Sequence, residues 1–281
     1  MFKMNKLLGQ NFLTSREIAE DIVNAADVGL SDIILEVGPG KGILTELLIE
    51  KAKKVIAVEK DKRLIDFLKE EFKEEIKNKK IELIYGDVLK FPKGVSLRIP
   101  KETPLGTYKI VANIPYYITS RFLRQFLSGA HQPTLMVLMV QKEVAERITT
   151  RDGKESILSI SVKAYGKPEI VRKVPAGCFY PKPKVDSAVI KISGISKNFF
   201  KEPPLTFPLA KGERKGVEEK FFELVKKGFG QKRKMLINNL KISPEIFNKC
   251  NIPQKVRAEN VSLGEWKCLL KGYPQKTADL I

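Results

Sequence analysis

The tetrapeptide Asn113-Ile-Pro-Tyr116 follows a strand-like run at 108–112. The amino nitrogen of an adenine base is a poor nucleophile, because its lone pair is delocalised into the ring. The side-chain oxygen of Asn113 and the carbonyl of Ile114 can accept hydrogen bonds from both N–H groups of such a base. This grip favours a pyramidal nitrogen whose lone pair is aimed at a reactive methyl group. The motif therefore predicts methyl transfer to a base amino group.

The other two residues of the motif support the same chemistry. Pro115 restricts the backbone, so its neighbours stay aimed. Tyr116 offers an aromatic face for an extruded base, a contact worth roughly 1–3 kcal/mol. An activated sulfonium methyl donor requires no general base, which fits a chain whose only histidine is His131. The alternative interpretation is an Asn-Pro turn with buried aromatic residues.

Three further features follow other strand-like runs. Gly38 and Gly40 lie in Glu36-Val-Gly-Pro-Gly-Lys-Gly42, a turn that differs from the dinucleotide and P-loop patterns. Glu59 ends the next run, where an acid can accept both ribose hydroxyls of an adenosine ligand. Asp87 follows the third, where a carboxylate can bind an adenine amino group. Each feature also has a simpler interpretation when it is taken alone. The glycines can form a tight turn, Glu59 can be an exposed acid at the end of a strand, and Asp87 can be a turn aspartate. Together they predict a nucleoside cofactor.

Strand-like and helix-like segments alternate from about residue 33 to residue 194. This alternation predicts an α/β fold with a doubly wound, mostly parallel sheet. A late pair of segments, 169–174 and 187–192, predicts an antiparallel hairpin at the sheet edge. The expected strands are 33–37, 54–59, 81–85, 108–112 and 134–140, and the expected helices are 42–52 and 61–78.

Flanking segments complete the predicted organisation. Thr14 and Glu17 form a capping-box pattern for a helix that ends near residue 26. Prolines and glycines predict a long loop at 91–107. Residues 196–216 contain three prolines among charges and predict a linker. Helices follow at 217–229 and 231–240, and two more are capped by Ser243 and Ser262. The predicted domains are a cofactor-binding domain at 1–195 and a helical domain at 217–281.

Composition adds a prediction about partners. The chain has 281 residues and a formal net charge of +18, from 51 Lys+Arg against 33 Asp+Glu. A polyanion partner turns such an excess into affinity through counterion release. The alternative is a lysine-rich surface with no specific partner. A cluster of basic residues lies at 226–234. It can contact phosphate groups or form a solvated helix face, and we favour phosphate contact.

The cysteines and the N-terminal residues bear on whether the protein holds disulfides or a metal, and on whether it is secreted or membrane-bound. Cys178, Cys250 and Cys268 are far apart and form no CxxC pair, which excludes a disulfide framework and the usual zinc sites, so we expect no metal. The first residues lack the apolar stretch of a signal peptide, and no run reaches membrane-spanning length. We therefore expect a cytoplasmic protein.

These motifs together resemble the ribosomal RNA adenine dimethyltransferase family, and within it the small-subunit branch. The resemblance covers nearly the whole chain, and the tail at 231–234 and 257–262 is similar to the terminal helices of that family. The loop at 93–107 is longer than is usual there. The matching segments are Leu8-Gly-Gln-Asn-Phe-Leu13, Glu36-Val-Gly-Pro-Gly40, Ala57-Val-Glu-Lys-Asp61, Gly86-Asp87, Val111-Ala-Asn-Ile-Pro-Tyr116 and Phe179-Tyr-Pro-Lys-Pro-Lys-Val-Asp-Ser187.

The resemblance implies a seven-stranded Rossmann-like domain that binds S-adenosylmethionine, joined to a helical domain that binds rRNA. Asn11 and Leu13 are expected to close over the cofactor. Gly38 is expected to face its methionine part, Glu59 its ribose and Asp87 its adenine amino group. Asn113 is expected between cofactor and substrate, and Phe179 as a second stacking face opposite Tyr116. Without the resemblance, Phe179 is interpreted as a core aromatic residue.

The implied reaction dimethylates N6 of two adjacent adenosines in the 3′-terminal hairpin loop of small-subunit rRNA. The expected substrate is the precursor particle, and the enzyme is expected to be a monomer. Three alternatives remain open. They are a large-subunit rRNA methyltransferase of the macrolide-resistance type, a non-catalytic RNA-binding or assembly factor, and a DNA adenine methyltransferase. The last is disfavoured because the chain has no recognisable DNA-reading module.

Overall fold

The computed structural model describes residues 10–90, 108–150, 153–201 and 214–272. The loop expected at 91–107 lies outside the described residues. The chain divides into two compact units. The first contains residues 1–149 and 166–196, and the second contains residues 150–165 and 197–281.

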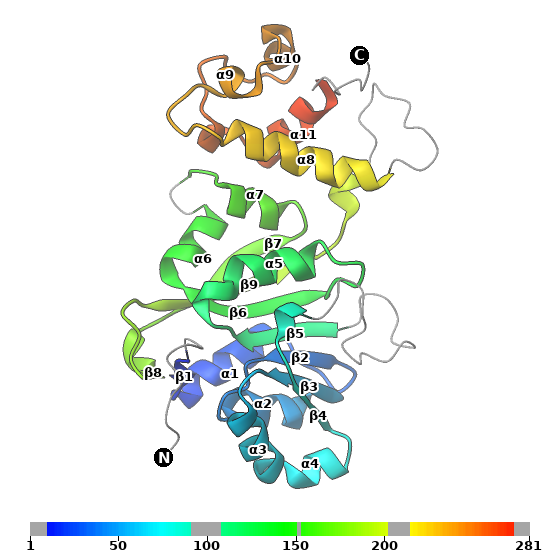
Figure 1. Ribbon diagram of the computed structural model, residues 1–281, viewed down its shortest axis with the longest axis vertical. Coiled ribbons are helices and arrows are strands. Elements are labelled where there is room, and N and C mark those ends of the chain that lie inside the picture. The colour runs from blue at the N-terminus through cyan, green and yellow to red at the C-terminus, as the bar shows by residue number, and fades with distance from the viewer. Residues whose placement is uncertain (1–9, 91–107, 151–152, 202–213, 273–281) are drawn as a thin grey trace. The chain divides into compact units, whose positions relative to one another are not determined.

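The first unit is built on one seven-stranded sheet (Figure 1). The five strands β4, β3, β2, β5 and β6 are parallel, and β9 runs antiparallel between β6 and β7. The mostly parallel α/β fold and the late hairpin are therefore confirmed. In spatial order the strands are β4 (Ile81–Tyr85), β3 (Lys54–Glu59), β2 (Ile33–Val37), β5 (Tyr108–Asn113), β6 (Leu135–Gln141), β9 (Ser187–Ser193) and β7 (Lys167–Val174).

Strand register brings the predicted motifs to one edge of this sheet. Val37 of β2 is level with Val58 of β3 and with Ala112 of β5. The residues that follow these positions therefore emerge side by side at the carboxyl ends of the strands, where doubly wound sheets bind their ligands.

Helices α1 (Arg16–Ala25) and α2 (Ile43–Lys51) share one apolar core with the sheet. Alternate strand residues such as Ile34, Val55 and Val111 enter this core beside Ile22 and Leu48, because side chains on a strand point to opposite faces in turn. Removal of this apolar surface from water contributes about 25 cal/mol per Å². The other helices of the unit are α3 (Lys62–Glu71), α4 (Lys73–Lys77), α5 (Thr119–Leu127) and α6 (Lys142–Thr149).

Two expected helix boundaries were wrong. The helix expected at 61–78 is broken at Phe72, whose φ of −109° and ψ of 36° are not helical. The ring of Phe72 lies beside Gly42, where an added Cβ atom would be 2.8 Å from it. The cap of α1 is Ser15, whose side chain accepts from the Ile18 amide, instead of Thr14.

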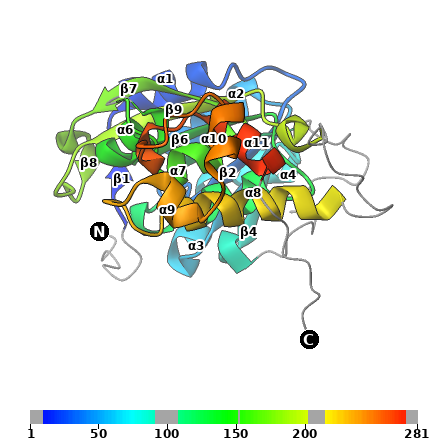
Figure 2. The ribbon, with the colours of Figure 1, turned by 90° about the horizontal axis from the view of Figure 1, so that it is seen from above.

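Thr14 has another function, because it anchors a two-stranded ribbon that the sequence analysis did not predict. Strand β1 (Phe12–Leu13) pairs antiparallel with β8 (Phe179–Tyr180), opposite Tyr180 and Phe179 respectively. The amide and the hydroxyl of Thr14 both donate to the carbonyl of Cys178, at 2.9 and 3.0 Å. Figures 1 and 2 show the two strands side by side. The N-terminal segment is thus attached to the segment that contains Phe179.

The second unit has its own helical core, which includes Trp266 and Phe221. Residues 150–165, expected in the first domain, belong to this unit because Ile160 and Ala164 pack in the same core. Phe199 and Phe200, expected in a linker, also pack against it. The helix expected at 231–240 is shorter in the structure, where α9 begins at Leu236. The helices of the unit are α7 (Ile157–Lys163), α8 (Arg214–Gly228), α9 (Leu236–Leu240), α10 (Pro244–Lys249) and α11 (Leu263–Gly272).

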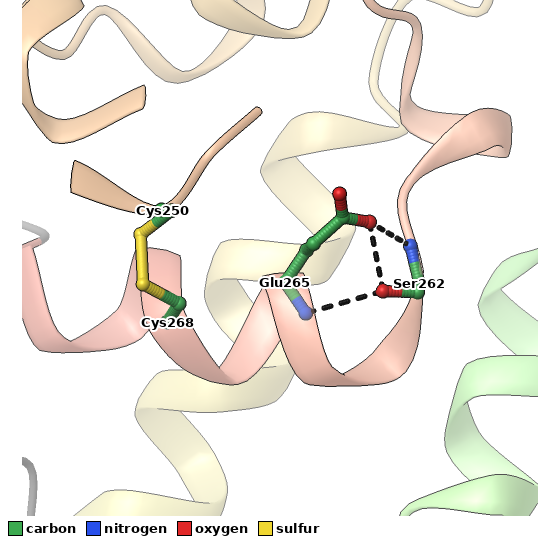
Figure 3. The surroundings of a disulfide bond; sticks show 4 residues. All are labelled: Cys250, Ser262, Glu265 and Cys268. Atoms are coloured by element: carbon green, nitrogen blue, oxygen red, sulfur yellow. Dashed lines mark hydrogen bonds between the residues drawn. A yellow bond between two sulfur atoms is a disulfide. The ribbon is translucent and has the colours of Figure 1, made fainter. Parts of the chain in front are cut away.

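A disulfide joins Cys250 to Cys268 in this unit (Figure 3). The wide spacing of the cysteines in the sequence excluded a disulfide framework, and it gave no indication of this single pair. The two cysteines are 18 positions apart in sequence, the segment between them leads from the end of α10 into α11, and the two helices pack together. The predicted cap of α11 is present, since the Ser262 amide donates to the Glu265 carboxylate at 2.7 Å.

Candidate active site

A single pocket at the carboxyl edge of the sheet collects most of the predicted site residues. The N-terminal segment, the glycine-rich turn after β2, the end of β3 and the motif after β5 all contribute to it. Asp87 and Phe179 are not among its lining residues. The predicted residues that line it are Asn11, Leu13, Gly38, Gly40, Glu59, Asn113, Ile114, Pro115 and Tyr116.

The glycine-rich turn gives the pocket a floor of bare backbone. Gly38 has a φ of 70° and Gly40 a φ of 62°, a region that side chains with a Cβ atom rarely adopt. A Cβ atom on Gly40 would lie only 3.0 Å from the Phe12 ring. Glycine is therefore required here both by conformation and by the close approach of the N-terminal segment.

Glu59 places a nearly buried carboxylate in the pocket. Its side chain accepts hydrogen bonds from the amides of Lys60 and Asp61, both at 2.8 Å, and from the Gly40 amide at 3.4 Å. Burial raises the pKa of Glu59, and these amide hydrogen bonds oppose part of the rise. A carboxylate has more acceptor sites than these bonds use, so Glu59 can also accept from a ligand hydroxyl.

Asp87 is held by two neighbours. The Lys60 ammonium donates to one carboxylate oxygen at 2.9 Å, and the Leu89 amide donates to the other at 3.0 Å. Burial alone raises the pKa of Asp87, but the hydrogen bond from Lys60 and that from the Leu89 amide outweigh it, so the pKa is lowered. Asp87 is thus an ionised acceptor. Its contact with a cofactor adenine stays a prediction.

The motif after β5 presents two acceptors. The side-chain amide nitrogen of Asn113 donates to the backbone carbonyl of Asn11 at 3.2 Å. Among the residues that the structure describes, none donates a hydrogen bond to the Asn113 side-chain oxygen or to the Ile114 carbonyl. Both residues line the pocket. They are therefore candidates to accept hydrogen bonds from a ligand, and their grip on an amino group stays a prediction.

Tyr116 is fixed by a residue to which the sequence analysis gave no role. Its hydroxyl lies 2.6 Å from the hydroxyl of Ser187, which is fully buried at the start of β9. Burial raises the pKa of Tyr116, and the Ser187 hydrogen bond opposes the rise. The only sequence signal was the position of Ser187 at the end of the segment that contains Phe179.

Phe179 is placed by the structure in the core. Its side chain is 4% exposed and lies in the same cluster as Leu13, its partner across the β1–β8 ribbon. Two tyrosines near the site are exposed instead, Tyr117 at 60% and Tyr180 at 53%. A stacking role for Phe179 stays a prediction.

Two further contacts attach the N-terminal segment to the rim of the pocket. The Gln10 side chain donates to the Asp61 carboxylate at 3.0 Å, and the Lys41 ammonium lies 5.7 Å from the centre of the Phe12 ring. The hydrogen bond from Arg63 lowers the pKa of Asp61 to about 2, although burial opposes it. The segment therefore rests on an ionised carboxylate.

Glu36 lies fully buried below the glycine-rich turn. Burial raises its pKa to about 8, nearby Glu59 adds to the rise, and the Thr45 hydroxyl opposes it. The Thr45 hydroxyl lies near enough to the Glu36 carboxyl group to lower its pKa. It makes no hydrogen bond of normal geometry with either carboxyl oxygen. The raised pKa favours the protonated, neutral form of Glu36 at pH 7.

The part of the chain that the structure describes was compared with the patterns of metal sites and of membrane-spanning helices. Within residues 10–90, 108–150, 153–201 and 214–272, no group of three or more His, Cys, Asp or Glu residues is arranged to hold a metal ion. No helix in the same ranges has both the length and the apolar character needed to cross a bilayer.

The sequence and the fold match proteins of known type. The family model described as ribosomal RNA adenine dimethylase matches residues 1–273. A protein of Dehalococcoides mccartyi (strain 195) named ribosomal RNA small subunit methyltransferase A is 41% identical, over 97% of this chain and 89% of that protein. A protein of Clostridium perfringens with the same name is 38% identical, over 95% of this chain and 90% of that protein.

Two solved structures are similar over nearly their whole length. A dimethyladenosine transferase from Plasmodium falciparum superimposes with a TM-score of 0.73 at 27% identity, covering 92% of this chain and 95% of that one. The 23S rRNA methyltransferase ErmE superimposes with a TM-score of 0.70 at 25% identity, covering 94% of this chain and 100% of that one. The fold of this chain is therefore shared with these two methyltransferases.

Proposed function

The chain belongs to the ribosomal RNA adenine dimethylase family, and from this premise we propose its substrate and its cofactor. It transfers methyl groups from S-adenosylmethionine to N6 of two adjacent adenosines in the 3′-terminal hairpin loop of small-subunit rRNA, and it dimethylates each. The observation that carries this proposal is the pair of acceptors on Asn113 and Ile114, which receive no hydrogen bond from the described residues, in a pocket with a glycine floor and the Glu59 carboxylate.

The residues of the pocket fit the proposed cofactor. The bare backbone at Gly38 and Gly40 would leave space for the methionine part, and the Glu59 carboxylate would accept from the ribose hydroxyls. Asp87, held ionised by Lys60, would accept from the adenine amino group. When bound, the cofactor supplies a methyl group that its sulfonium centre already activates.

The protein's contribution is to orient the acceptor base. The Asn113 oxygen and the Ile114 carbonyl would hold the two N–H groups of adenine, in a geometry that becomes more favourable as charge develops on the nitrogen. Tyr116, anchored by Ser187, would provide one stacking face, and Phe179 the other. A target in a hairpin loop suits this site, because loop bases are already partly unstacked.

The small-subunit target is supported by the names of relatives that are 38–42% identical over nearly the full chain. The rival target is large-subunit rRNA, because ErmE has the same fold at 25% identity. The higher identity favours the small subunit. We also propose, as parts of this function, that a monomer acts on the precursor particle in the cytoplasm and that the second unit holds its rRNA. The net charge of +18 supports a polyanion partner.

One assay separates these targets. Small and large subunits from cells that lack the respective modifications are incubated with the protein and with methyl-labelled S-adenosylmethionine. We expect label only in small-subunit RNA, at adenine N6, with two methyl groups on each of two adjacent adenosines after digestion. Label only in large-subunit RNA would refute the small-subunit assignment, and no label in either RNA would refute the activity. A DNA hairpin of the same sequence serves as the control for substrate class.

A further inference from the structure

The Asn113 side chain has two chemically different ends, and a neighbour decides which end faces the base. An amide side chain can turn by half a rotation and exchange its oxygen for its NH₂ group. With the NH₂ group towards the substrate, Asn113 would oppose a donor to the adenine amino group. Only the orientation with the oxygen towards the pocket supports the proposed chemistry.

The neighbour is the backbone carbonyl of Asn11. It accepts the Asn113 NH₂ group at 3.2 Å. In the reverse orientation two oxygens would face each other at this distance, with no hydrogen between them. The carbonyl therefore selects the orientation that leaves the Asn113 oxygen for the substrate.

This carbonyl is held firmly on both sides. Before it, the Gln10 side chain donates to Asp61 at 3.0 Å. After it, Phe12 and Leu13 pair with β8, and Thr14 donates twice to the Cys178 carbonyl. A backbone group between two such anchors has little freedom to move. That rigidity is the requirement for a group that sets the orientation of a catalytic side chain.

We propose that Asn11 is a positioning residue for methyl transfer, acting through its backbone carbonyl on the Asn113 amide. The N-terminal segment then has a second function besides covering the cofactor: it aligns the group that receives the substrate amine. This inference rests on the proposed function, because it assumes that Asn113 accepts from an adenine N–H group.

The test is the pH profile of Asn113→Asp. A protonated carboxyl can donate to the Asn11 carbonyl and still accept from the base, as the amide does. An ionised carboxylate can only accept, and one of its oxygens would face the Asn11 oxygen. We therefore expect the single-turnover rate of this variant to rise as the pH falls, by about tenfold per pH unit above the pKa of the new carboxyl group.

Wild type is the control, because the same ionisable side chains line its pocket, namely Lys41, Glu59, Lys60, Tyr116 and Tyr117. Both proteins are assayed on undermethylated small subunits with saturating labelled cofactor, and cofactor binding confirms that the variant is folded. A variant profile parallel to that of wild type, or one that rises with pH, would overturn the inference.

A second variant tests the carbonyl directly. Incorporating the α-hydroxy acid analogue of Phe12 converts the peptide bond after Asn11 into an ester, whose carbonyl is a weaker acceptor. We expect kcat to fall about three- to tenfold, the range for one neutral hydrogen bond, with a cofactor Kd changed less than about twofold. The analogue of Leu13 is the matched control, since it leaves the Asn11 carbonyl in an amide. Equal losses in both variants would contradict the inference.

These outcomes are separate from failure of the proposed function. Wild type that labels no RNA would refute the activity itself. Wild type that labels only large subunits would refute the target, and both profiles would then be measured on that substrate. An active wild type with an Asp variant insensitive to acid would refute only the role of Asn11.

Discussion

The hydroxyl groups of Tyr116 and Ser187 lie 2.6 Å apart, and this contact joins the motif after β5 to the first residue of β9. Ser187→Ala removes the anchor of the Tyr116 ring and leaves its part-buried hydroxyl without this partner. We expect kcat/KM for rRNA methylation to fall about three- to tenfold, with cofactor affinity unchanged.

Tyr116→Phe is the matched variant, because it removes the other partner of the same hydrogen bond. If the contact is the cause, the double variant loses little more activity than either single variant. If the losses of the two single variants add up in the double variant, the two hydroxyls act independently.

Asn113→Ala removes one of the two proposed acceptors for the adenine amino group. Because this interaction strengthens as charge develops, we expect kcat to fall by about 10²–10³-fold, as for the loss of an oxyanion-hole donor. The dissociation constant of S-adenosylmethionine, measured by calorimetry, should change much less. Unchanged turnover would refute the assigned role, and an equal loss of cofactor binding would point to a structural cause.

The buried Glu36 makes stability depend on pH. Its pKa is about 8 in the folded protein, against an ordinary value of 4.5. Between these values the folded state holds a proton that the unfolded state has lost. The free energy of unfolding therefore decreases as the pH rises from 4.5 to about 8, with a slope of up to about 1.4 kcal/mol per pH unit.

Glu36→Gln keeps the shape of the neutral acid but cannot ionise. Urea unfolding at several pH values should show that this contribution to the slope is lost. The free energy of unfolding of the variant should therefore increase relative to that of wild type as the pH rises towards 8. The two proteins should differ least near pH 5. A constant difference between them at all pH values would contradict the buried-acid explanation.

The disulfide between Cys250 and Cys268 should stabilise the second unit. Its cysteines are 18 residues apart, and closing a loop of this size contributes about 3 kcal/mol in the chain-entropy account. Fluorescence of Trp266, the only tryptophan of the chain, reports on this unit because its side chain is fully buried there. We expect dithiothreitol to move the fluorescence transition to lower urea concentration.

A variant with both Cys250→Ser and Cys268→Ser should unfold at the lower concentration with or without the reductant. Cys178→Ser, which leaves the disulfide intact, should respond as wild type does. A wild-type transition that does not respond to reductant would contradict a stabilising disulfide.

Much of the sheet could be predicted because its information is local. Buried parallel strands appear as short apolar runs, and the polar residues that follow them must meet at one edge. Glu59 and Asn113 can be located by this rule from the order of residues alone. The helix break at Phe72 could not be predicted, because Leu64, Leu68, Phe72 and Ile76 keep a helical spacing across it.

The contacts missed by the sequence analysis join residues that are distant along the chain. The Tyr116–Ser187 contact, the disulfide and the β1–β8 ribbon each depend on tertiary packing that no local pattern encodes. Strand β1 has only two residues, too few for a periodicity. Thr14 looked like a helix cap, and its true partner, the Cys178 carbonyl, is 164 residues away.

The ribbon between β1 and β8 has a consequence for how the enzyme is made. In the sequence of the first unit, β1 lies near the start and β8 lies near the end. The ribbon therefore cannot form during translation until β8 has left the ribosomal exit tunnel. Contacts of such long sequence separation form late and slowly. A nascent chain released before that point would lack the β8 anchor of the N-terminal segment, and with it one of the two contacts that we propose hold the Asn11 carbonyl against the Asn113 amide.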